Sequence, residues 1–319
     1  MNKVPIVFAF DNNLVFPACI CLSSLMMHAK ENTFYDIYIL HSEHEQLNCE
    51  ELDKLPTYYS NCCITYRSVG DLFDSSFEIR GITTPAYYRL LIPELIPEYD
   101  KVIYSDVDVI FRDDLSDIYF RTDLNDEYFA GVNSLSHLLK DTKDYYEKTL
   151  NMSAEGIIYS GNLIINSKKI REDNLTPQFS LLADKKYRFQ DMDMINVVCK
   201  EHIKYLSPSF CLTNYINDFA VNNRKEILSI WTEEEINEAL EKGIVHYNGQ
   251  KPWKGFCVNF DIWWEYYRKS PYFNEQFYFD FFYKKLDELD SLSLWKRIKI
   301  LIRYFVYGKN KGFCYYSHL

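Results

Sequence analysis

Two aspartates separated by a single residue, Asp106 and Asp108, follow a short apolar run about one third of the way along the sequence. The apolar residues 102–104 and 109–111 on either side of them predict a buried strand. Side chains alternate between the two faces of a strand, so both carboxylates are expected to point to the same side. Buried like charges repel each other and lose hydration, and a divalent cation or a shared proton would neutralise them. A turn or capping pair without an ion is the alternative interpretation.

A histidine, a glycine and a lysine lie close together much later in the sequence, at His246, Gly249 and Lys251. Taken alone, the histidine is more often a core or surface residue than a metal ligand, and the lysine could be a loop charge. Together with Asp106 and Asp108, His246 completes a candidate ligand set, because Mn²⁺ takes carboxylate oxygens and also one imidazole nitrogen. Phosphate oxygens would fill the remaining positions, so the ion would act as a Lewis acid on a diphosphate leaving group.

The elements that must position these residues begin with an alternation of strands and helices. This order is typical of an α/β fold with a parallel sheet, whose ligands bind beyond the carboxyl ends of the strands. The polar turn Asp11-Asn12-Asn13 follows the first strand. Neither a GxGxxG pattern nor a P-loop occurs, which argues against a dinucleotide fold or a P-loop NTPase. Strands are predicted over residues 6–10, 35–40 and 63–69, and helices over residues 15–28 and 43–55.

Further elements are predicted on both sides of the aspartate pair. Residues 83–96 predict a helix, and residues 128–132 and 157–166 predict two strands. The second of these strands contains Ser160-Gly161-Asn162, and a glycine inside a strand indicates a bulge or a close approach of the backbone to another group. A helix is predicted over residues 189–199, because the carboxylates in its first turn suit the positive end of a helix dipole.

Length and composition limit the class of protein. The 319 residues suggest a catalytic domain over residues 1–255 and a helical, aromatic-rich extension over residues 256–319. A net charge of −11 argues against nucleic-acid binding. Nine cysteines without CxxC spacing predict reduced thiols, and the sequence contains neither a signal peptide pattern nor a membrane-spanning run. A cytoplasmic protein is therefore expected.

The end of the chain differs from the rest in charge. From residue 291 onward there are six basic residues and no acidic ones. A helix over residues 294–307 would carry Leu294, Ile298 and Leu301 on one face and lysines and arginines on another. Such a helix can lie on an anionic membrane surface, which would make the protein peripheral on the inner face. A helix packed on the domain with a solvated basic face, or one that binds a partner protein, is an open alternative.

Six motifs in a fixed order connect these features to a known family. The chain resembles glycosyltransferase family 8, whose retaining enzymes include bacterial lipopolysaccharide galactosyl- and glucosyltransferases and glycogenin. The resemblance covers roughly residues 4–270 and implies a GT-A type fold, with a mixed, mostly parallel sheet flanked by helices and a helical C-terminal extension. The motifs are Phe8-Ala-Phe-Asp-Asn-Asn13, Ala86-Tyr-Tyr-Arg-Leu90, Tyr104-Ser-Asp-Val-Asp108, Ser160-Gly161 with Asn166, Gln190-Asp-Met-Asp193 and His246-Tyr-Asn-Gly-Gln-Lys-Pro-Trp253.

The resemblance also implies roles for individual residues. Asp106, Asp108 and His246 would bind Mn²⁺ or Mg²⁺, which bridges the two phosphates of a uridine-diphosphate (UDP) sugar. Gln190, Asp191 and Lys251 would form the catalytic set, with Asp191 at the donor sugar and Lys251 at the diphosphate. The residues implied for binding the donor are Asp11, Asn12, Asn13, Arg89, Ser105, Asp106, Val107, Asp108, Gly161, Asn162, Asp191, Gly249 and Lys251.

Two departures from the family pattern bear on the mechanism. Met192 stands where the family often has a glutamine beneath the anomeric carbon, and methionine cannot act as a nucleophile. The prediction is therefore a front-face mechanism, in which the acceptor hydroxyl attacks from the leaving-group side and its proton passes to a departing phosphate oxygen. Tyr159 replaces an asparagine of the bacterial galactosyltransferases, so the identity of the sugar does not transfer from them.

The function predicted from the sequence is transfer of a hexose from UDP-glucose or UDP-galactose to a glycan or glycolipid acceptor. Met192 motivates the alternative of a UDP-sugar-binding protein without transferase activity. A metal-dependent phosphohydrolase that uses the first aspartate of a DxD pair as its nucleophile is the weakest interpretation. In those enzymes the pair follows the first strand, whereas Asp106 comes after about a hundred residues of α/β structure.

Overall fold

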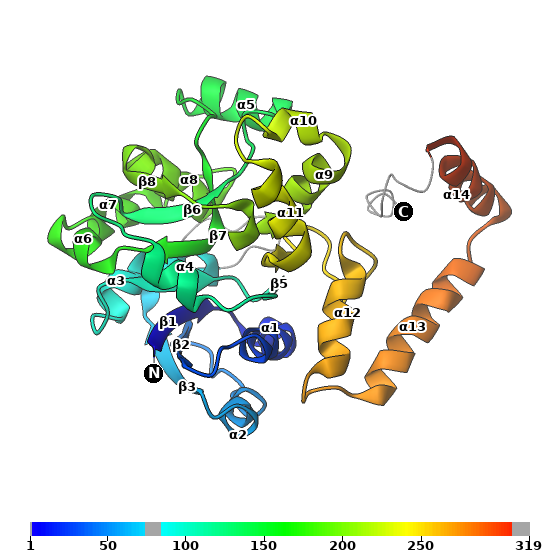
Figure 1. Ribbon diagram of the computed structural model, residues 1–319, viewed down its shortest axis with the longest axis horizontal. Helices are drawn as coiled ribbons and strands as arrows, with labels where there is room; N and C mark the ends of the chain where they lie inside the picture. Colours follow the sequence, from blue (N-terminus) through cyan, green and yellow to red (C-terminus); the bar gives the residue numbers. More distant parts are fainter. Residues whose placement is uncertain (1, 74–83, 308–319) are drawn as a thin grey trace. The chain divides into compact units, whose positions relative to one another are not determined.

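The computed structural model describes residues 2–73 and 84–307 (Figure 1). The chain divides into two compact units, Met1–His246 and Tyr247–Leu319. Within the described residues the first unit holds a seven-stranded sheet and a three-stranded sheet, and the second unit holds three helices. The division of function expected between residues 1–255 and 256–319 stays a prediction.

The large sheet is mixed and mostly parallel, as predicted, and helices flank it (Figure 1). Its order is β3-β2-β1-β4-β7-β6-β8, and β7 is the strand that runs antiparallel to both of its neighbours. From Val4 onward β1 is fully buried, which suits a parallel strand covered on both faces. The strands are β1 (Asn2–Ala9), β2 (Thr33–Ser42), β3 (Cys62–Val69), β4 (Val102–Ser105), β6 (Phe129–Asn133), β7 (Ile158–Ile165) and β8 (Ile203–Tyr205).

One face of this sheet packs on a continuous apolar core. Val7 and Tyr104 from the strands belong to the same buried cluster as Phe179, Met194 and Ile195 from two helices, α7 (Thr176–Leu182) and α8 (Gln190–Cys199). The helix α1 (Val15–Met27) is buried along most of its length. Because α8 belongs to this core, its first turn has a fixed position next to the sheet.

The predicted strand over residues 101–111 is divided in two. The first part is β4, and the second part is β5 (Val109–Ile110), which belongs to a separate small sheet of order β5-β10-β9. The partners of β5 in this sheet are β10 (Val245–His246) and β9 (Leu212–Thr213). Asp106 and Asp108 therefore lie where the chain passes from one sheet to the other.

The prediction of a helix over residues 43–55 is wrong. The structure has a loop there, then a 3₁₀ turn (Leu52–Lys54) and the short helix α2 (Leu55–Tyr58). The side-chain amide of Asn12 donates to Glu45 Oε1 and to Gln46 O, and it accepts from the Asn48 backbone N–H. Because these hydrogen bonds engage backbone groups of the loop, they compete with the hydrogen bonds that a helix would form there.

The helix predicted over residues 83–96 is also only partly right. Residue 83 lies outside the described residues, and Thr84–Leu91 forms a 3₁₀ helix followed by α3 (Ile92–Leu95). The other helices of the first unit are α4 (Ser116–Arg121), α5 (Lys140–Asp144), a π-helical turn (Tyr145–Thr149), α6 (Ser167–Glu172), α9 (Asn214–Asn222), α10 (Arg224–Ile227) and α11 (Glu233–Lys242).

The second unit is helical, as predicted for the C-terminal extension. It comprises α12 (Phe260–Lys269), α13 (Glu275–Asp290) and α14 (Leu294–Tyr307). Trp264 of α12 is buried and contacts Phe281 of α13 with ring centroids 4.5 Å apart. Over residues 2–73 and 84–307, no helix combines the length and the apolar character needed to cross a bilayer.

Candidate active site

The two aspartates and the histidine singled out in the sequence meet at one place. Asp106 Oδ2 lies 3.6 Å from His246 Nε2, and Asp108 Oδ1 lies 3.3 Å from the same nitrogen. One ligand atom from each of the three residues lies within 4.8 Å of the other two. The antiparallel pairing of β5 with β10, which sets His246 opposite Val109, produces this proximity. The small sheet thus brings together residues that lie far apart in the sequence.

The electrostatics of this cluster favour a positive charge between the three groups. Burial opposes protonation of His246, but the Asp108 carboxylate outweighs it and raises the pKa of the imidazole to about 10. Two carboxylates and one ring nitrogen that face a common point are also the ligand set that Mn²⁺ accepts, and Mg²⁺ takes the two carboxylates. The donor set therefore fits a divalent cation of this class.

Gly161 forms one wall of the cluster. A Cβ atom at this position would lie 2.2 Å from Cε1 of His246 and 2.8 Å from Oδ2 of Asp106. The close backbone approach predicted from a glycine inside the strand is therefore present. The predicted bulge is present as well, since Gly131 pairs with Leu163 whereas Asn133 pairs with Ile158. Gly161 reaches Asp106 through the pairing of β7 with β4, because the Asp106 N–H donates to Gly161 O at 2.8 Å.

Arg89 is a buried guanidinium that ties the site together. It donates to Asp106 Oδ1 at 2.9 Å and to Ser160 O at 2.5 Å, and its Nε lies 3.3 Å from Asp191 Oδ2. It also lies over the Tyr104 ring, 4.3 Å from the centroid. Burial opposes the charge, but the two carboxylates outweigh it and raise the pKa of Arg89. Arg89 thus fixes one oxygen of Asp106 and leaves the other facing His246.

Gln190 and Asp191 start α8 and are both buried. Gln190 has φ of 48°, a left-handed conformation that is uncommon for a residue with a side chain. Burial raises the pKa of Asp191, although Arg89 opposes this shift. Met192, by contrast, packs against the apolar cluster of Tyr146, Ala154 and Ile157. The structure therefore places Asp191 beside the Arg89 and Asp106 pair and gives Met192 an apolar environment.

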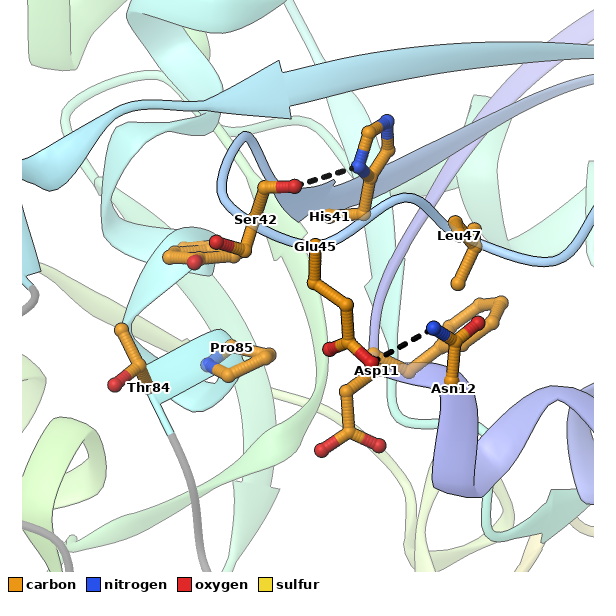
Figure 2. A pocket seen from close by; sticks show the side chains of 10 residues that line it. Asp11, Asn12, His41, Ser42, Glu45, Leu47, Thr84 and Pro85 are labelled. Carbon is orange, nitrogen blue, oxygen red and sulfur yellow. Dashed lines mark hydrogen bonds between the residues drawn. The ribbon is translucent and has the colours of Figure 1, made fainter.

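The turn after β1 borders a pocket of about 260 Å³ (Figure 2). Asp11 caps the following 3₁₀ helix by accepting from the Asn13 N–H, and Asn13 is exposed. The Asn12 side chain makes three hydrogen bonds to residues 45–48 and so holds that loop in place. The pocket lies at the carboxyl ends of β1 and β2, and its lining residues are Phe10, Asp11, Asn12, His41, Ser42, Glu45, Leu47, Thr84, Pro85 and Tyr88.

Three residues predicted for the donor site, Ser105, Val107 and Asn162, are buried next to the two aspartates in the sequence or in the sheet. Ser105 is fully buried, donates to Asp106 O and accepts from the side chain of Asn162. Val107 is buried between the two aspartates. Sequence reasoning missed Tyr104, whose hydroxyl donates to Asp106 Oδ1 at 2.7 Å. The spacing of Tyr104 and Asp106, two residues apart in one motif, could have indicated this contact.

Gly249 and Lys251 belong to the second unit. Gly249 is exposed, and Lys251 is half-buried and donates to Tyr247 O at 2.7 Å. Their assignment to a diphosphate stays a prediction. Sequence reasoning also missed Cys211, whose Sγ lies 3.5 Å from Nδ1 of His246, because nothing in its sequence context connects it to the histidine.

Comparison with known proteins identifies solved glycosyltransferases with a similar fold. The WbbM bifunctional glycosyltransferase aligns over 87% of this chain and 51% of its own, with a TM-score of 0.70 and 25% identity. The galactosyltransferase LgtC, solved in complex with donor and acceptor sugar analogues, aligns over 86% of this chain and 98% of its own, with a TM-score of 0.68 and 23% identity. The fold is therefore of the GT-A type found in these glycosyltransferases.

Sequence comparison extends this likeness. Glycosyltransferase GlyE of Streptococcus pneumoniae is 25% identical over 278 residues, which cover 83% of this chain and 61% of GlyE. The chain thus spans 61% of the length of GlyE and about half the length of WbbM. The model of glycosyl transferase family 8 matches residues 5–257, which is most of the sequence. The chain belongs to glycosyl transferase family 8.

Proposed function

We propose that this protein is a retaining hexosyltransferase that moves glucose or galactose from UDP-glucose or UDP-galactose to a glycan or glycolipid acceptor. The observation that carries the proposal is the convergence of Asp106, Asp108 and His246 in a chain of this family. Mn²⁺, or Mg²⁺, would be held by these three residues. When bound, the ion supplies positive charge that stabilises a departing diphosphate.

The protein's own residues would bind and orient the donor. The pocket beside Asp11 lies where parallel strands end, which is where α/β sheets bind nucleotides, and it supports a role in holding the nucleoside. Arg89 and Asp191 offer a donor and an acceptor for sugar hydroxyls next to Asp106. Lys251, which follows His246 closely in sequence, would place a compact charge on the diphosphate.

The environment of Met192 supports the front-face mechanism. Its side chain packs with apolar residues, and a thioether cannot form the ester-type intermediate that a carboxylate would. In this mechanism the acceptor hydroxyl attacks the anomeric carbon from the side of the departing diphosphate. Its proton passes to a phosphate oxygen, so the protein needs no general base, and the anomeric configuration is retained.

A donor screen tests the proposal. Purified protein is incubated with UDP-glucose, UDP-galactose and their N-acetyl forms in the presence of Mn²⁺, and release of UDP is measured. We expect slow hydrolysis of one hexose donor, abolished by EDTA and restored by Mn²⁺. Asp108→Asn should lose several orders of magnitude in rate, because it removes a charged ligand while keeping the size of the side chain.

The matched control is Asp113→Asn, which changes a half-exposed aspartate paired with Lys242 at 3.6 Å. This variant should release UDP at the rate of the unaltered protein. Full activity in EDTA, or full activity of Asp108→Asn, would contradict the metal assignment. NMR of the glycoside formed with an added sugar acceptor gives the anomeric configuration, and an inverted product would contradict retention.

A UDP-sugar-binding protein without transferase activity is the second candidate, motivated by Met192. Calorimetry separates the two functions. Tight binding of UDP together with no release of UDP from any donor, with or without acceptors, would favour the binding protein.

α14 supports a peripheral contact with the anionic inner face of a membrane, where a glycolipid acceptor would reside. Its Leu294 and Trp295 side chains are 73% and 75% exposed. Lys296, Arg297 and Lys299 follow directly in the same helix. Apolar and cationic side chains on one exposed helix suit the interface of an anionic bilayer.

A further inference from the structure

His246 has polar neighbours on both edges of its ring. Its Nε2 faces the carboxylates of Asp106 and Asp108, at 3.6 and 3.3 Å. Its Nδ1, on the opposite edge, lies 3.5 Å from Sγ of Cys211. Cys211 is completely buried and His246 is 5% exposed, so water competes little for this contact.

The backbone fixes the thiol next to the ring. Cys211 directly precedes β9, and the parallel pairing of β9 with β10 sets Thr213 beside His246. A hydrogen bond from the Leu212 N–H to Ile244 O continues this pairing at 2.7 Å. Gly243 lets the two segments approach, because a Cβ there would lie 2.8 Å from Ser209 Cα. The position of Sγ therefore follows from the small sheet itself.

The orientation of the ring decides whether His246 can bind a cation. A neutral imidazole coordinates through one nitrogen while the other nitrogen carries a proton. A rotation of the ring by half a turn would exchange Nε2 for Cε1 and present a C–H group to Asp106 and Asp108. Gly161 lies against the ring and limits its position, but a glycine offers no side-chain group that distinguishes nitrogen from carbon.

We propose that Cys211 is the positioning residue of the metal site. In this arrangement the Nδ1–H of His246 donates to Sγ of Cys211, which keeps the Nε2 lone pair directed at a cation shared with Asp106 and Asp108. Outer partners of metal-bound histidines are more often carboxylates or backbone carbonyls. A thiol is a weaker acceptor, so it orients the ring while adding little to its basicity. This inference rests on the metal site of the proposed function.

Direct binding of Mn²⁺ tests the positioning role without any turnover. The signal of free Mn²⁺ in electron paramagnetic resonance gives the Kd for the full-length protein in the absence of a donor. Cys211→Val and Cys211→Ala remove the acceptor and should raise the Kd by about 10- to 100-fold, the range for loss of an outer-shell partner. Cys211→Ser keeps an acceptor and should retain most of the affinity. At saturating Mn²⁺ the KM for the donor should stay at the wild-type value.

The matched control is Cys199→Ala, which removes a fully buried thiol that lies in the apolar core. This variant should bind Mn²⁺ as the wild type does, and thermal denaturation verifies that each protein folds. Wild-type affinity in both Cys211→Val and Cys211→Ala, with a loss in His246→Ala, would overturn the positioning role and leave the proposed function intact. An equal loss in Cys199→Ala would overturn it too. Wild-type protein that binds Mn²⁺ no better than His246→Ala would overturn both proposals.

Discussion

At position 161 the space for a side chain is already filled by the ring of His246 and a carboxylate oxygen of Asp106. An added methyl group would lie 2.2 Å from the ring, a distance at which one of the two must move. Displacement of a catalytic group by about 1 Å can reduce a rate by roughly 100-fold. We therefore expect Gly161→Ala to lose that much UDP-release activity and to bind Mn²⁺ more weakly.

Gly70→Ala is the control for this substitution. A Cβ there would meet Glu43 at 3.5 Å, which is an ordinary contact distance. Its activity and its thermal denaturation should match the wild type. If Gly161→Ala kept both full activity and full Mn²⁺ affinity, the close packing of Gly161 on the ligands would have no bearing on function.

Arg89 gives a prediction about stability. Arg89 is the buried cation between the partly buried Asp106 and the buried Asp191, and Arg89→Met would leave both carboxylates without it. Removal of one member of a buried ion pair typically destabilises a protein by about 3–5 kcal/mol. Urea denaturation at pH 7 in EDTA should therefore show a loss of this size in the free energy of unfolding.

Arg121→Met is the control for Arg89→Met. The Arg121 side chain is 83% exposed and lies 3.8 Å from Asp117 one helical turn away. Such surface pairs contribute about 0.3–0.5 kcal/mol. An equally small effect at Arg89 would mean that its contacts contribute little to stability.

The sequence indicates only some of the residues that form the candidate site. The paired aspartates carry a local pattern, and a glycine inside a strand predicts close packing, so Asp106, Asp108 and Gly161 were accessible from the sequence. The partner of His246 was not, because Cys211 reaches the ring only through the pairing of two-residue strands far apart in the chain. Strands this short carry no periodicity that a sequence could reveal.

Among the elements, α11 supports the small sheet that carries His246. Thr232 and Glu235 form a capping box at its start, and Arg112 donates to the carbonyls of Ala239, Leu240 and Gly243 at its end. Both ends of the helix thus have partners for backbone groups that would otherwise be unpaired.

Loss of the cap on α11 should weaken the fold measurably. Thr232→Ala removes the side-chain acceptor for the Glu235 N–H and should lower the free energy of unfolding by about 1 kcal/mol. Chemical denaturation measures this change. Thr232→Ser retains the hydroxyl and should lie close to the wild type, and an equal loss in both variants would exclude the cap as the cause.

The elements themselves were predicted unevenly. The buried strands of the large sheet and the helix at residues 189–199 follow from local patterns, and the structure contains them as β1 to β4, β6, β7 and α8. The helix expected over residues 43–55 failed because the side chain of Asn12, far away in sequence, bonds to that segment. A long-range contact of this kind overrides local propensity.

At the scale of the whole molecule, acid stability depends on a buried carboxylate in the large sheet. Asp36 of β2 accepts from the Cys63 thiol at 2.9 Å and pairs with the Lys3 ammonium at 2.7 Å. Burial alone would raise the pKa of Asp36, but these two partners and the Tyr99 hydroxyl together outweigh it and lower the pKa. The ionised Asp36 therefore stabilises the folded state at pH values above the ordinary carboxyl pKa, near pH 4. This stabilisation is lost as the pH falls below that value and through the lowered pKa of the folded state.

Asp36→Asn should reduce this pH dependence. The free energy of unfolding of the wild type should fall on acidification below about pH 4, and that of the variant should fall less steeply. Urea denaturation at a series of pH values measures both slopes. Asp100→Asn, which alters an aspartate that is 74% exposed, should keep the wild-type slope. Identical slopes for the wild type and Asp36→Asn would rule out this source of acid sensitivity.

The basic helix gives a prediction for the intact chain. Full-length protein should co-sediment with vesicles that contain phosphatidylglycerol and not with vesicles of phosphatidylcholine alone, and salt should weaken the binding. A chain that ends at Ser291 should lose this binding. Equal binding of both chains, or equal binding to both vesicle types, would contradict a membrane role for α14.

The pairing of Val109 with His246 also has a consequence for folding during synthesis on the ribosome. Strands distant in sequence pair late, because a long loop must close before their contacts form. A nascent chain that has emerged as far as β9 holds both aspartates but not yet His246. The candidate metal site can therefore form only after β10 has emerged, so a product truncated or stalled before β10 would lack the histidine of that site.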